Sequence, residues 1–253
     1  MFLKSLGLLS LAALAGCGPQ PARPPDAPTP NPASDYAAAP SVTEVRMVGA
    51  APVLSGTAPP GAPVRLGSPD GAALLAAADP SGHWSLRLPP AAEPRIFGLS
   101  ARLGKRQVQG QGYLLVTAQG RAALLRAGAG AIRLDPLRSP ALTALDTDNG
   151  GAAVISGLAP ADTLLFLRID GEQVAQARAD GVGRYGMALN QPLSRGAHTL
   201  EVSGDSFVNT AQVEVAPAQP LAAGPLRSQF TRGGLRVDWL TPGGGVQSTV
   251  LLD

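Results

Sequence analysis

The sequence contains the stretch Val53-Leu54-Ser55-Gly56, and 101 positions later it contains Val154-Ile155-Ser156-Gly157. At this spacing several turn residues and one aromatic position match as well. The further matches are Ala58-Pro59 with Ala159-Pro160, Ala78-Asp79 with Ala179-Asp180, Gly82 with Gly183, and Trp84 with Tyr185. Agreement of apolar, turn and aromatic positions together indicates an internal repeat, so the two stretches belong to two copies of one structural unit.

Each copy is predicted to consist of short strands. Short apolar runs alternate with clusters of Gly, Pro, Asp and Ser, a pattern typical of an all-β sandwich or barrel. Asp70-Gly71 and Asp170-Gly171 are hairpin signals in the middle of the two units. An Asp-x-x-Gly turn then leads into a strand that carries Trp84 in the first unit and Tyr185 in the second. We expect these two rings to be the aromatic anchors of the two cores.

This order of Ser-Gly, Pro-Gly, Asp-Gly and Asp-x-x-Gly-x-Trp resembles bacterial immunoglobulin-like modules over about residues 42–116 and 145–216. The resemblance implies two immunoglobulin-like β-sandwiches. It implies no particular activity, because such sandwiches serve in adhesion, spacing and binding alike. We therefore expect one β-domain over residues 42–135 and a second over residues 136–216.

The C-terminal residues 217–253 are predicted to form a β-hairpin. Leu235-Arg236-Val237-Asp238-Trp239 alternates apolar and polar residues, and a turn at Thr241-Pro242-Gly243-Gly244-Gly245 precedes a returning apolar run. A two-stranded hairpin alone is marginally stable in water. We therefore expect residues 226–252 to dock on a sheet edge of the β-domains, with residues 110–134 as a candidate edge.

The N-terminus has the features of a cleaved export signal. Lys4 precedes an apolar run from Leu6 to Ala15, which at about ten residues is too short to span a bilayer as a helix. Leu14-Ala15-Gly16-Cys17 resembles the lipobox of bacterial lipoproteins, in which the cysteine thiol is diacylated after the signal is removed. The resemblance implies a signal peptide over residues 1–16 and lipidation of Cys17, with the membrane as the partner of the acyl chains. An ordinary secretory signal is the alternative.

Residues 17–41 are rich in proline and are predicted to form a disordered, extended tether. Proline lacks an amide hydrogen and fixes φ, so this stretch favours neither a helix nor a sheet. In lipoproteins an aspartate after the lipidated cysteine often signals retention in the inner membrane, and here Gly18 takes that place. The resemblance therefore implies the outer membrane, within the cell envelope, as the destination. Cys17 is the single cysteine of the chain, which excludes an internal disulfide.

Charge and composition exclude two function classes. The formal net charge is +2, and the arginines are scattered along the sequence, whereas nucleic-acid binding requires a dense basic face. His83 and His198 are the two histidines, and they lie in different repeats. We interpret His83 as an exposed turn residue and His198 as a strand-face residue. With no Gly-x-Ser-x-Gly motif either, the sequence predicts no enzyme, no catalytic residue and no cofactor.

Two features keep binding alternatives open. Asp146 and Asp148, in Asp146-Thr147-Asp148-Asn149-Gly150-Gly151, are spaced like the first ligands of a calcium loop, but the bidentate Glu at position twelve is missing. We interpret this stretch as an interdomain turn, with a weak Ca²⁺ site as the alternative, and predict no metal site. Trp239 and Tyr113 are candidate glycan-stacking residues, and a buried docking role for Trp239 is the favoured interpretation.

The sequence therefore predicts a lipid-anchored protein of the cell envelope that acts as a non-enzymatic spacer or interaction module. An envelope protein is the expected partner. The alternatives are an obligate subunit of an assembly that anchors or exports a surface structure, and a glycan-binding module.

Overall fold

The computed structural model describes residues 38–253. The predicted signal peptide, Cys17 and the predicted tether up to residue 37 lie outside the described residues. The described part consists of strands and turns without an α-helix, so the all-β fold predicted from the sequence is confirmed. Among the residues described, no helix is long and apolar enough to cross a membrane.

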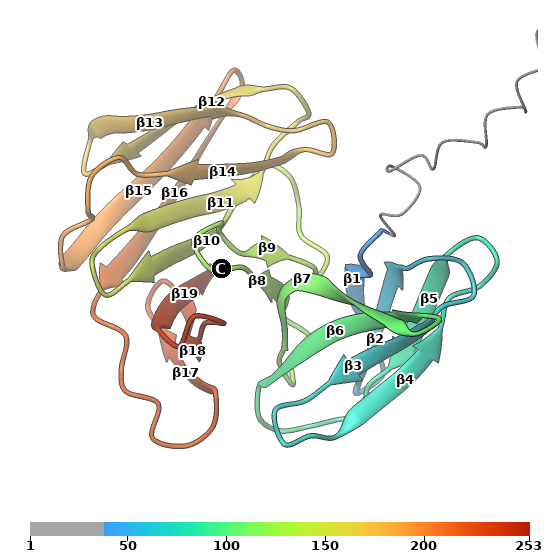
Figure 1. Ribbon diagram of the computed structural model, residues 1–253. Coiled ribbons are helices and arrows are strands. Elements are labelled where there is room, and N and C mark those ends of the chain that lie inside the picture. Colours follow the sequence, from blue (N-terminus) through green and yellow to red (C-terminus); the bar gives the residue numbers. More distant parts are fainter. Residues whose placement is uncertain (1–37) are drawn as a thin grey trace, which may run out of the picture. The chain divides into compact units, whose positions relative to one another are not determined.

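The first module is a sandwich of two sheets (Figure 1). The smaller sheet has the strand order β1-β2-β5, and the larger has β4-β3-β6-β7-β8-β9. The strands are β1 (Ser41–Val48), β2 (Ala51–Thr57), β3 (Pro63–Gly67), β4 (Ala73–Ala77), β5 (His83–Arg87), β6 (Arg95–Leu103), β7 (Arg106–Val116), β8 (Ala122–Leu125) and β9 (Ile132–Arg133). The first seven form an immunoglobulin-like three-plus-four sandwich, and β8 and β9 extend the larger sheet beyond β7.

The second module repeats this arrangement. Its strands are β10 (Ala141–Asp148), β11 (Ala153–Leu158), β12 (Leu164–Ile169), β13 (Glu172–Arg178), β14 (Arg184–Ala188), β15 (Gly196–Gly204) and β16 (Phe207–Val215). β10, β11 and β14 lie in one sheet, and the other sheet has the order β13-β12-β15-β16. The first hairpin of each module carries a register shift at the corresponding place, between residues 42 and 44 and between residues 142 and 144.

The glycine of each Ser-Gly pair makes room for the aromatic ring of its module. A Cβ at Gly56 would overlap the Trp84 ring, and a Cβ at Gly157 would overlap the Tyr185 hydroxyl; each would also overlap a backbone carbonyl oxygen. Both rings are buried. The Trp84 Nε1–H and the Tyr185 hydroxyl each donate to a backbone carbonyl, at 3.1 and 3.2 Å. The two predicted core anchors are therefore confirmed.

The Asp-x-x-Gly turns are also built alike. The Asp79 carboxylate accepts hydrogen bonds from the amides two and four residues later, at 2.8 and 2.9 Å, and Asp180 accepts the equivalent pair at 3.0 and 2.8 Å. Gly82 and Gly183 follow with φ of +83° and +78°, a conformation that glycine adopts without strain. These local contacts explain why the turn residues recur at the same spacing.

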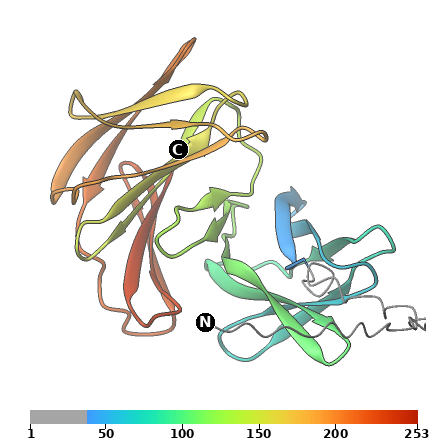
Figure 2. The same ribbon diagram turned by 45° about the horizontal axis from the view of Figure 1, so that its top comes forward.

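The C-terminal tail contains the predicted hairpin, in which β18 (Gly234–Leu240) pairs with β19 (Val246–Leu252). A third strand that was not predicted, β17 (Leu226–Thr231), pairs with β18. β19 pairs antiparallel with β10, so the sheet has the order β14-β11-β10-β19-β18-β17 (Figures 1 and 2). The hydrogen-bonded edge is thus β10 and not residues 110–134, where β7 and β8 already pair with strands on both sides. Residues in that range contact the tail through side chains instead.

Three buried clusters form the core. Two of them fill the two sandwiches, and the third joins the extension of the first module to the tail. The members of this junction cluster are Ile96, Leu115, Ala123, Leu125, Ala131, Ala144, Leu235, Val237, Trp239 and Leu251. The two modules are therefore joined by a packed apolar junction within residues 38–253.

Candidate functional site

Trp239 belongs to the junction cluster and is fully buried. Its ring meets Tyr113 edge to face, with 6.1 Å between the centroids. A buried indole has no face to offer a sugar ring, so a glycan-stacking role for Trp239 is wrong, and the favoured docking interpretation describes the structure. Tyr113 is half-buried against the same cluster.

Asp146 links the junction to the tail. Its carboxylate is buried and accepts hydrogen bonds from the Ala131 amide at 2.7 Å, from Gln247 Nε2 at 3.2 Å and from Thr249 Oγ1 at 2.5 Å. Thr249 Oγ1 in turn accepts from Trp239 Nε1 at 3.0 Å. One carboxylate thus connects the loop before β9, the strand β10 and the tail strand β19.

Burial raises the pKa of Asp146 to about 6, although the hydrogen bonds from Thr249, Ala131 and Gln247 act in the opposite direction. Burial disfavours the charged form of a carboxyl group more strongly than these donors favour it. The tail is what covers this carboxyl group, since two of its three hydrogen-bond partners belong to β19.

The prediction that residues 146–151 form an interdomain turn is wrong. Asp146 and Asp148 lie on β10, and the turn that follows joins β10 to β11 inside the second module. Asp148 Oδ1 accepts from the amides of Gly150 and Ala152 at 2.8 and 2.9 Å, so this carboxylate closes its own turn. Among the residues described, no group of three or more metal-ligating side chains could hold a metal ion.

Two arginines complete the attachment of the tail. Arg133 is buried, forms a paired contact with Asp135 at 2.8 and 2.6 Å, and donates to the Leu252 carbonyl at 2.9 Å. Arg236 donates to Asp238 at 3.0 Å and to the carbonyls of residues 216 and 217, which lie between β16 and β17. Each guanidinium group therefore links its own strand to the backbone of a segment distant in sequence. The planar guanidinium suits this role, because it can donate several hydrogen bonds at once.

His198 has an acidic partner that sequence reasoning missed. Its Nδ1 lies 2.6 Å from Asp170 Oδ2, and its Nε2 lies 2.9 Å from the Ser194 carbonyl and 3.3 Å from Ser194 Oγ. Asp170 is 28 residues away in sequence, in the left-handed conformation (φ 53°) of the hairpin turn between β12 and β13. An aspartate in a hairpin turn was the available signal, but the sequence did not indicate which strand it would face.

The Ser194, His198 and Asp170 side chains resemble a catalytic triad in composition and differ from one in hydrogen bonding. Both ring nitrogens face acceptors, the Asp170 carboxylate and the Ser194 carbonyl, so the protonated ring satisfies both contacts. Burial lowers the pKa of His198, but the contacts with Asp170 and the Ser194 carbonyl outweigh it and raise the pKa overall. A general base requires a free nitrogen facing the nucleophile, and here the carbonyl occupies that position at the shorter distance. We assign this group a structural role that fixes the β12–β13 turn to β15.

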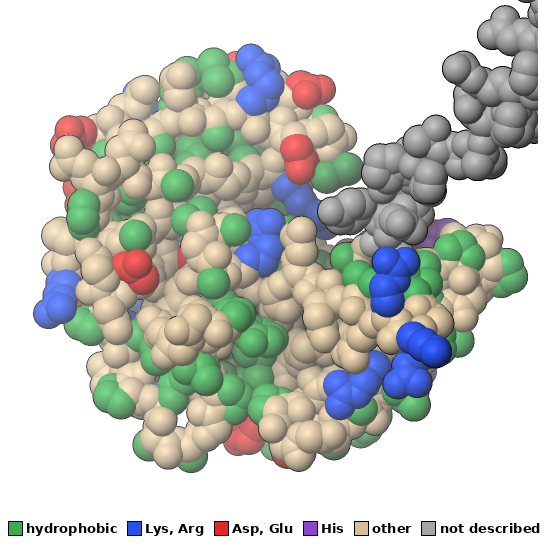
Figure 3. Space-filling view, viewed as in Figure 1, with side chains coloured by type: hydrophobic (Ala, Val, Ile, Leu, Met, Phe, Trp, Pro, Cys, Tyr) green, Lys and Arg blue, Asp and Glu red, His purple; other side chains and the backbone are tan. Residues whose placement is uncertain are grey.

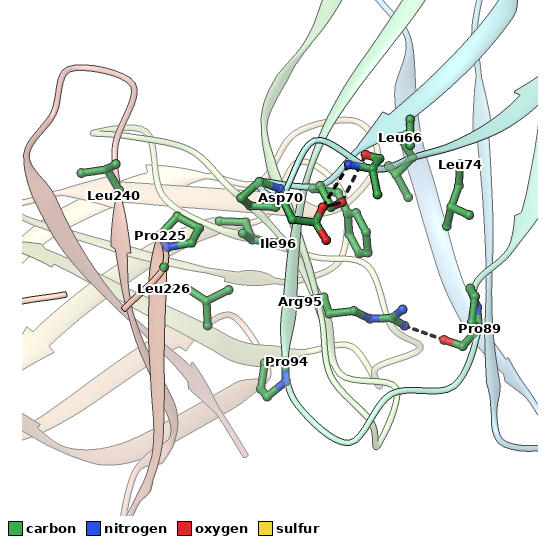
Figure 4. Close-up of a pocket in the computed structure, with 16 residues that line it drawn as sticks. Leu66, Asp70, Leu74, Pro89, Pro94, Arg95, Ile96, Pro225, Leu226 and Leu240 are labelled. Carbon is green, nitrogen blue, oxygen red and sulfur yellow. Dashed lines mark hydrogen bonds between the residues drawn. The ribbon is translucent and has the colours of Figure 1, made fainter. Parts of the chain in front are cut away.

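An apolar groove of about 790 Å³ lies beside the junction. Hydrophobic side chains gather around it in the lower middle of the surface in Figure 3. The close-up in Figure 4 shows Ile96 of the first module facing Leu226 of the tail, with Leu240 beyond it. The groove is lined by Leu66, Ser68, Pro69, Asp70, Ala72, Ala73, Leu74, Pro89, Pro94, Arg95, Ile96, Phe97, Gly224, Pro225, Leu226 and Leu240.

The two charged residues of the groove are held by neighbouring backbone. Asp70 accepts from the Ser68 hydroxyl and from the Ala72 amide, and these hydrogen bonds lower its pKa. Arg95 donates to the Pro89 carbonyl at 2.8 Å and lies 5.5 Å above the Phe97 ring. The groove therefore offers chiefly apolar contact area, which suits a protein or peptide surface better than a small polar metabolite.

Comparison with solved structures finds 13 similar chains, including the following two. One is described as "Biofilm associated protein - BSP domain", with 13% identity and a TM-score of 0.25, covering 72% of this chain and 30% of that chain. The other is described as "Central Fibronectin-III array of RIM-binding protein", with 14% identity and a TM-score of 0.26, covering 86% and 90%. No protein-family model matches the sequence, and a search of curated proteins finds no match. The class that the fold defines is a tandem of immunoglobulin-like β-sandwich repeats.

Proposed function

We propose that this chain is a lipid-anchored, non-enzymatic spacer and interaction module of the bacterial cell envelope. The observation that supports a spacer most directly is the junction cluster, which joins two β-sandwiches through buried apolar contacts and a shared buried carboxylate. A spacer must hold its far end at a defined place, and a packed junction does this better than a flexible linker. The lipobox-like stretch that ends at Cys17 supports the anchor, with the outer membrane as the proposed location.

The anchor is tested by mass spectrometry of the chain purified from detergent-solubilised envelopes. We expect a chain that begins at Cys17 and carries acyl groups, and we expect Cys17→Ala to release the protein into the soluble fraction. Two or three acyl chains anchor a protein stably, whereas their loss leaves only surface contacts. An intact, unacylated Met1 terminus would contradict the proposal.

A second candidate function is an obligate subunit of a larger envelope assembly, and the apolar groove favours it. Leu240 lines the groove from the tail and is 41% exposed. Covering such a surface with a partner would remove apolar area from water. The test is cross-linking and pull-down of the Leu240→Asp variant from envelopes, with Val182→Asp as a matched control at an exposed position away from the groove. Loss of one specific partner with Leu240→Asp alone supports this candidate, and equal recovery from both variants contradicts it.

A further inference from the structure

The two modules carry opposite net charge. Residues 42–135 contain ten Lys or Arg and five Asp or Glu, a net charge of +5, whereas residues 136–216 contain five and nine, a net charge of −4. The scattered arginines of the sequence are therefore unevenly divided between the modules. The positive module is the one that lies nearer in sequence to the proposed anchor.

Equivalent sheets show this difference most clearly. Strands β3, β4, β6 and β7 of the first module carry four arginines and no acidic residue, namely Arg65, Arg95, Arg102 and Arg106. The corresponding strands β12, β13, β15 and β16 of the second module carry Arg168, Arg178, Glu172, Glu201 and Glu214. In the second module Arg168 pairs with Glu201 at 3.1 Å. Within residues 38–253, the exposed cations of the first sheet have no such ion pair.

Four of the cations gather toward one end of the first sheet. Arg65 lies opposite Ser100 on the next strand, and Arg102 follows two residues later, so the two arginines are diagonal neighbours on the outer face. Lys105 and Arg106 lie at the turn between β6 and β7. All four cations are exposed, and Lys and Arg side chains gather over this module at the right of Figure 3. We call these four residues, together with Leu75, the basic face.

The acidic groups of the first module are engaged elsewhere. Glu44 lies on the other sheet and contacts Arg46 at 2.5 Å, and Asp135 pairs with the buried Arg133. Asp70 and Asp79 accept hydrogen bonds within their own turns, and Glu93 precedes β6 at the end of the sheet opposite to Lys105. The basic face is therefore not neutralised by its own module.

Leu75 lies directly opposite Arg65 and is 70% exposed. An exposed leucine beside cations is the combination that binds a lipid surface, because the apolar side chain enters the interface while the cations meet anionic headgroups. A soluble acidic polymer would bind the cations but would gain nothing from Leu75.

We propose that the basic face docks on an anionic phospholipid membrane surface. This inference deepens the proposed function and rests on it for its setting, since an anchor at Cys17 keeps the first module close to a membrane. Docking through the first module would leave the negatively charged second module and the groove available to partners. The anchor and the basic face would then be two signals for the same membrane.

The test uses the mature chain from residue 17 with Cys17→Ala, so that no acyl chain contributes. We expect it to co-sediment with vesicles of equal parts phosphatidylglycerol and phosphatidylcholine, and not with vesicles of phosphatidylcholine alone. Each cation close to an anionic surface strengthens binding about fivefold. The triple variant Arg102→Gln, Lys105→Gln, Arg106→Gln should therefore bind about 100-fold more weakly, and raising the salt should weaken the wild type.

A matched control removes three exposed cations from the rest of the molecule: Arg195→Gln, Arg227→Gln, Arg232→Gln. We expect this control to bind within about threefold of the wild type, because its cations lie outside the basic face. Equal losses in both triple variants, or no binding by the wild type, would overturn the proposal. Leu75→Ser should weaken vesicle binding severalfold. Equally tight binding to an acidic polysaccharide, unchanged by Leu75→Ser, would assign the face to a glycan and overturn the lipid assignment.

The outcome is separable from that of the anchor. An unacylated chain that still binds anionic vesicles would leave the basic face standing and remove the anchor. If the native chain is acylated but its Cys17→Ala form does not bind vesicles, the anchor stands and the basic face is removed.

Discussion

The two modules build the same sandwich with the same local contacts, yet they are extended on different sheets. In the first module β8 and β9 continue the larger sheet beyond β7, and in the second the tail continues the smaller sheet beyond β10. An unpaired edge strand exposes a row of backbone donors and acceptors and invites unwanted pairing. Each module thus covers one such edge, but by a different segment of the chain.

The two extensions also contact each other. The junction cluster takes Ala123, Leu125 and Ala131 from the first extension and Leu235, Val237 and Trp239 from the second. Segments that cover edges therefore also join the modules, and the difference between the repeats is what produces the joint. Identical repeats would have lacked these complementary surfaces.

The largest effect is expected from removing the tail, residues 226–253. Its deletion exposes the edge of β10 and the apolar face of the first extension, and it removes buried side chains such as Trp239 and Leu251. Burial of each such side chain stabilises by about 1.5–3 kcal/mol, so we expect a loss of about 6 kcal/mol or more in calorimetry. Hydrogen exchange should rise in β10 far more than in β1. An unchanged melting temperature would show that the tail does not support the modules.

The second test asks whether the shared glycine serves both modules equally. Gly56→Ala and Gly157→Ala each place a Cβ against a backbone carbonyl and the anchoring ring. Overpacking of this kind costs about 3 kcal/mol, and we expect similar losses in both modules by chemical denaturation. Gly98→Ala on β6 and Gly186→Ala on β14 are controls in the two modules, because there is open space around the Cβ position at both sites. A large loss in one module alone would break the equivalence of the repeats.

The third test concerns a position where the modules differ, since Asp146 is buried and the equivalent Arg46 of the first module is exposed. The pKa of Asp146 is raised to about 6, above the ordinary 3.8. The folded state therefore binds the proton more tightly than the unfolded state, and this contribution is present below about pH 4 and lost as the pH rises through 6. One pKa unit corresponds to about 1.4 kcal/mol, so the loss is about 3 kcal/mol by pH 8.

Asp146→Asn should abolish most of this pH dependence between pH 4 and 8 in denaturant titrations, because the amide carries no charge to bury. Its oxygen can accept from the Ala131 amide and its nitrogen can donate to Thr249 Oγ1, while the hydrogen bond from Gln247 Nε2 is lost. Arg46→Gln is the control and should leave the pH profile unchanged. The same pH profile in Asp146→Asn and the wild type would mean that another group controls it.

The parts of the fold that could be predicted from the sequence are those fixed by near neighbours. The Asp-x-x-Gly turns depend on amides two and four residues away, and the rings of Trp84 and Tyr185 depend on a glycine in the adjacent strand. The alternation of residues 235–239 likewise indicated one buried face. These signals repeat at a fixed spacing, so each copy supports the other.

The pairing of the tail could not be predicted, for a physical reason. Alternation shows which face of a strand is buried but not which edge it joins, and β10 lies about a hundred residues before β19. Asp146 is buried because of that pairing. Since the pairing was not predicted, Asp146 was interpreted as part of an interdomain turn. One signal for the buried carboxylate was available in the sequence. The polar residues Gln247, Ser248 and Thr249 interrupt an otherwise apolar strand, as hydrogen-bond partners of a buried carboxylate would.

The smallest effect is expected at the Asp-Gly hairpin turn, which the modules close differently. Asp70 accepts from its own turn, whereas Asp170 accepts from the Thr199 amide at 2.8 Å and contacts His198 at 2.6 Å. The raised pKa of His198 means that its contribution is present below about pH 6.5 and is lost as the pH rises through the raised value. The lowered pKa of Asp170 means that its contribution is present above 3.8 and is lost as the pH falls through the lowered value. The pair therefore stabilises the fold between these limits.

His198→Gln should lower the melting temperature by about 2–4 °C at pH 6 and by less at pH 9, because the wild-type ring loses its proton as the pH rises through its raised pKa. His83→Gln is the matched control, since His83 is largely exposed and lies 4.0 Å from Asp79. We expect no change from it at either pH. A loss from His198→Gln that is equal at pH 6 and pH 9 would show that the ring contributes by packing and not by charge. The second module would then differ from the first in shape alone at this turn.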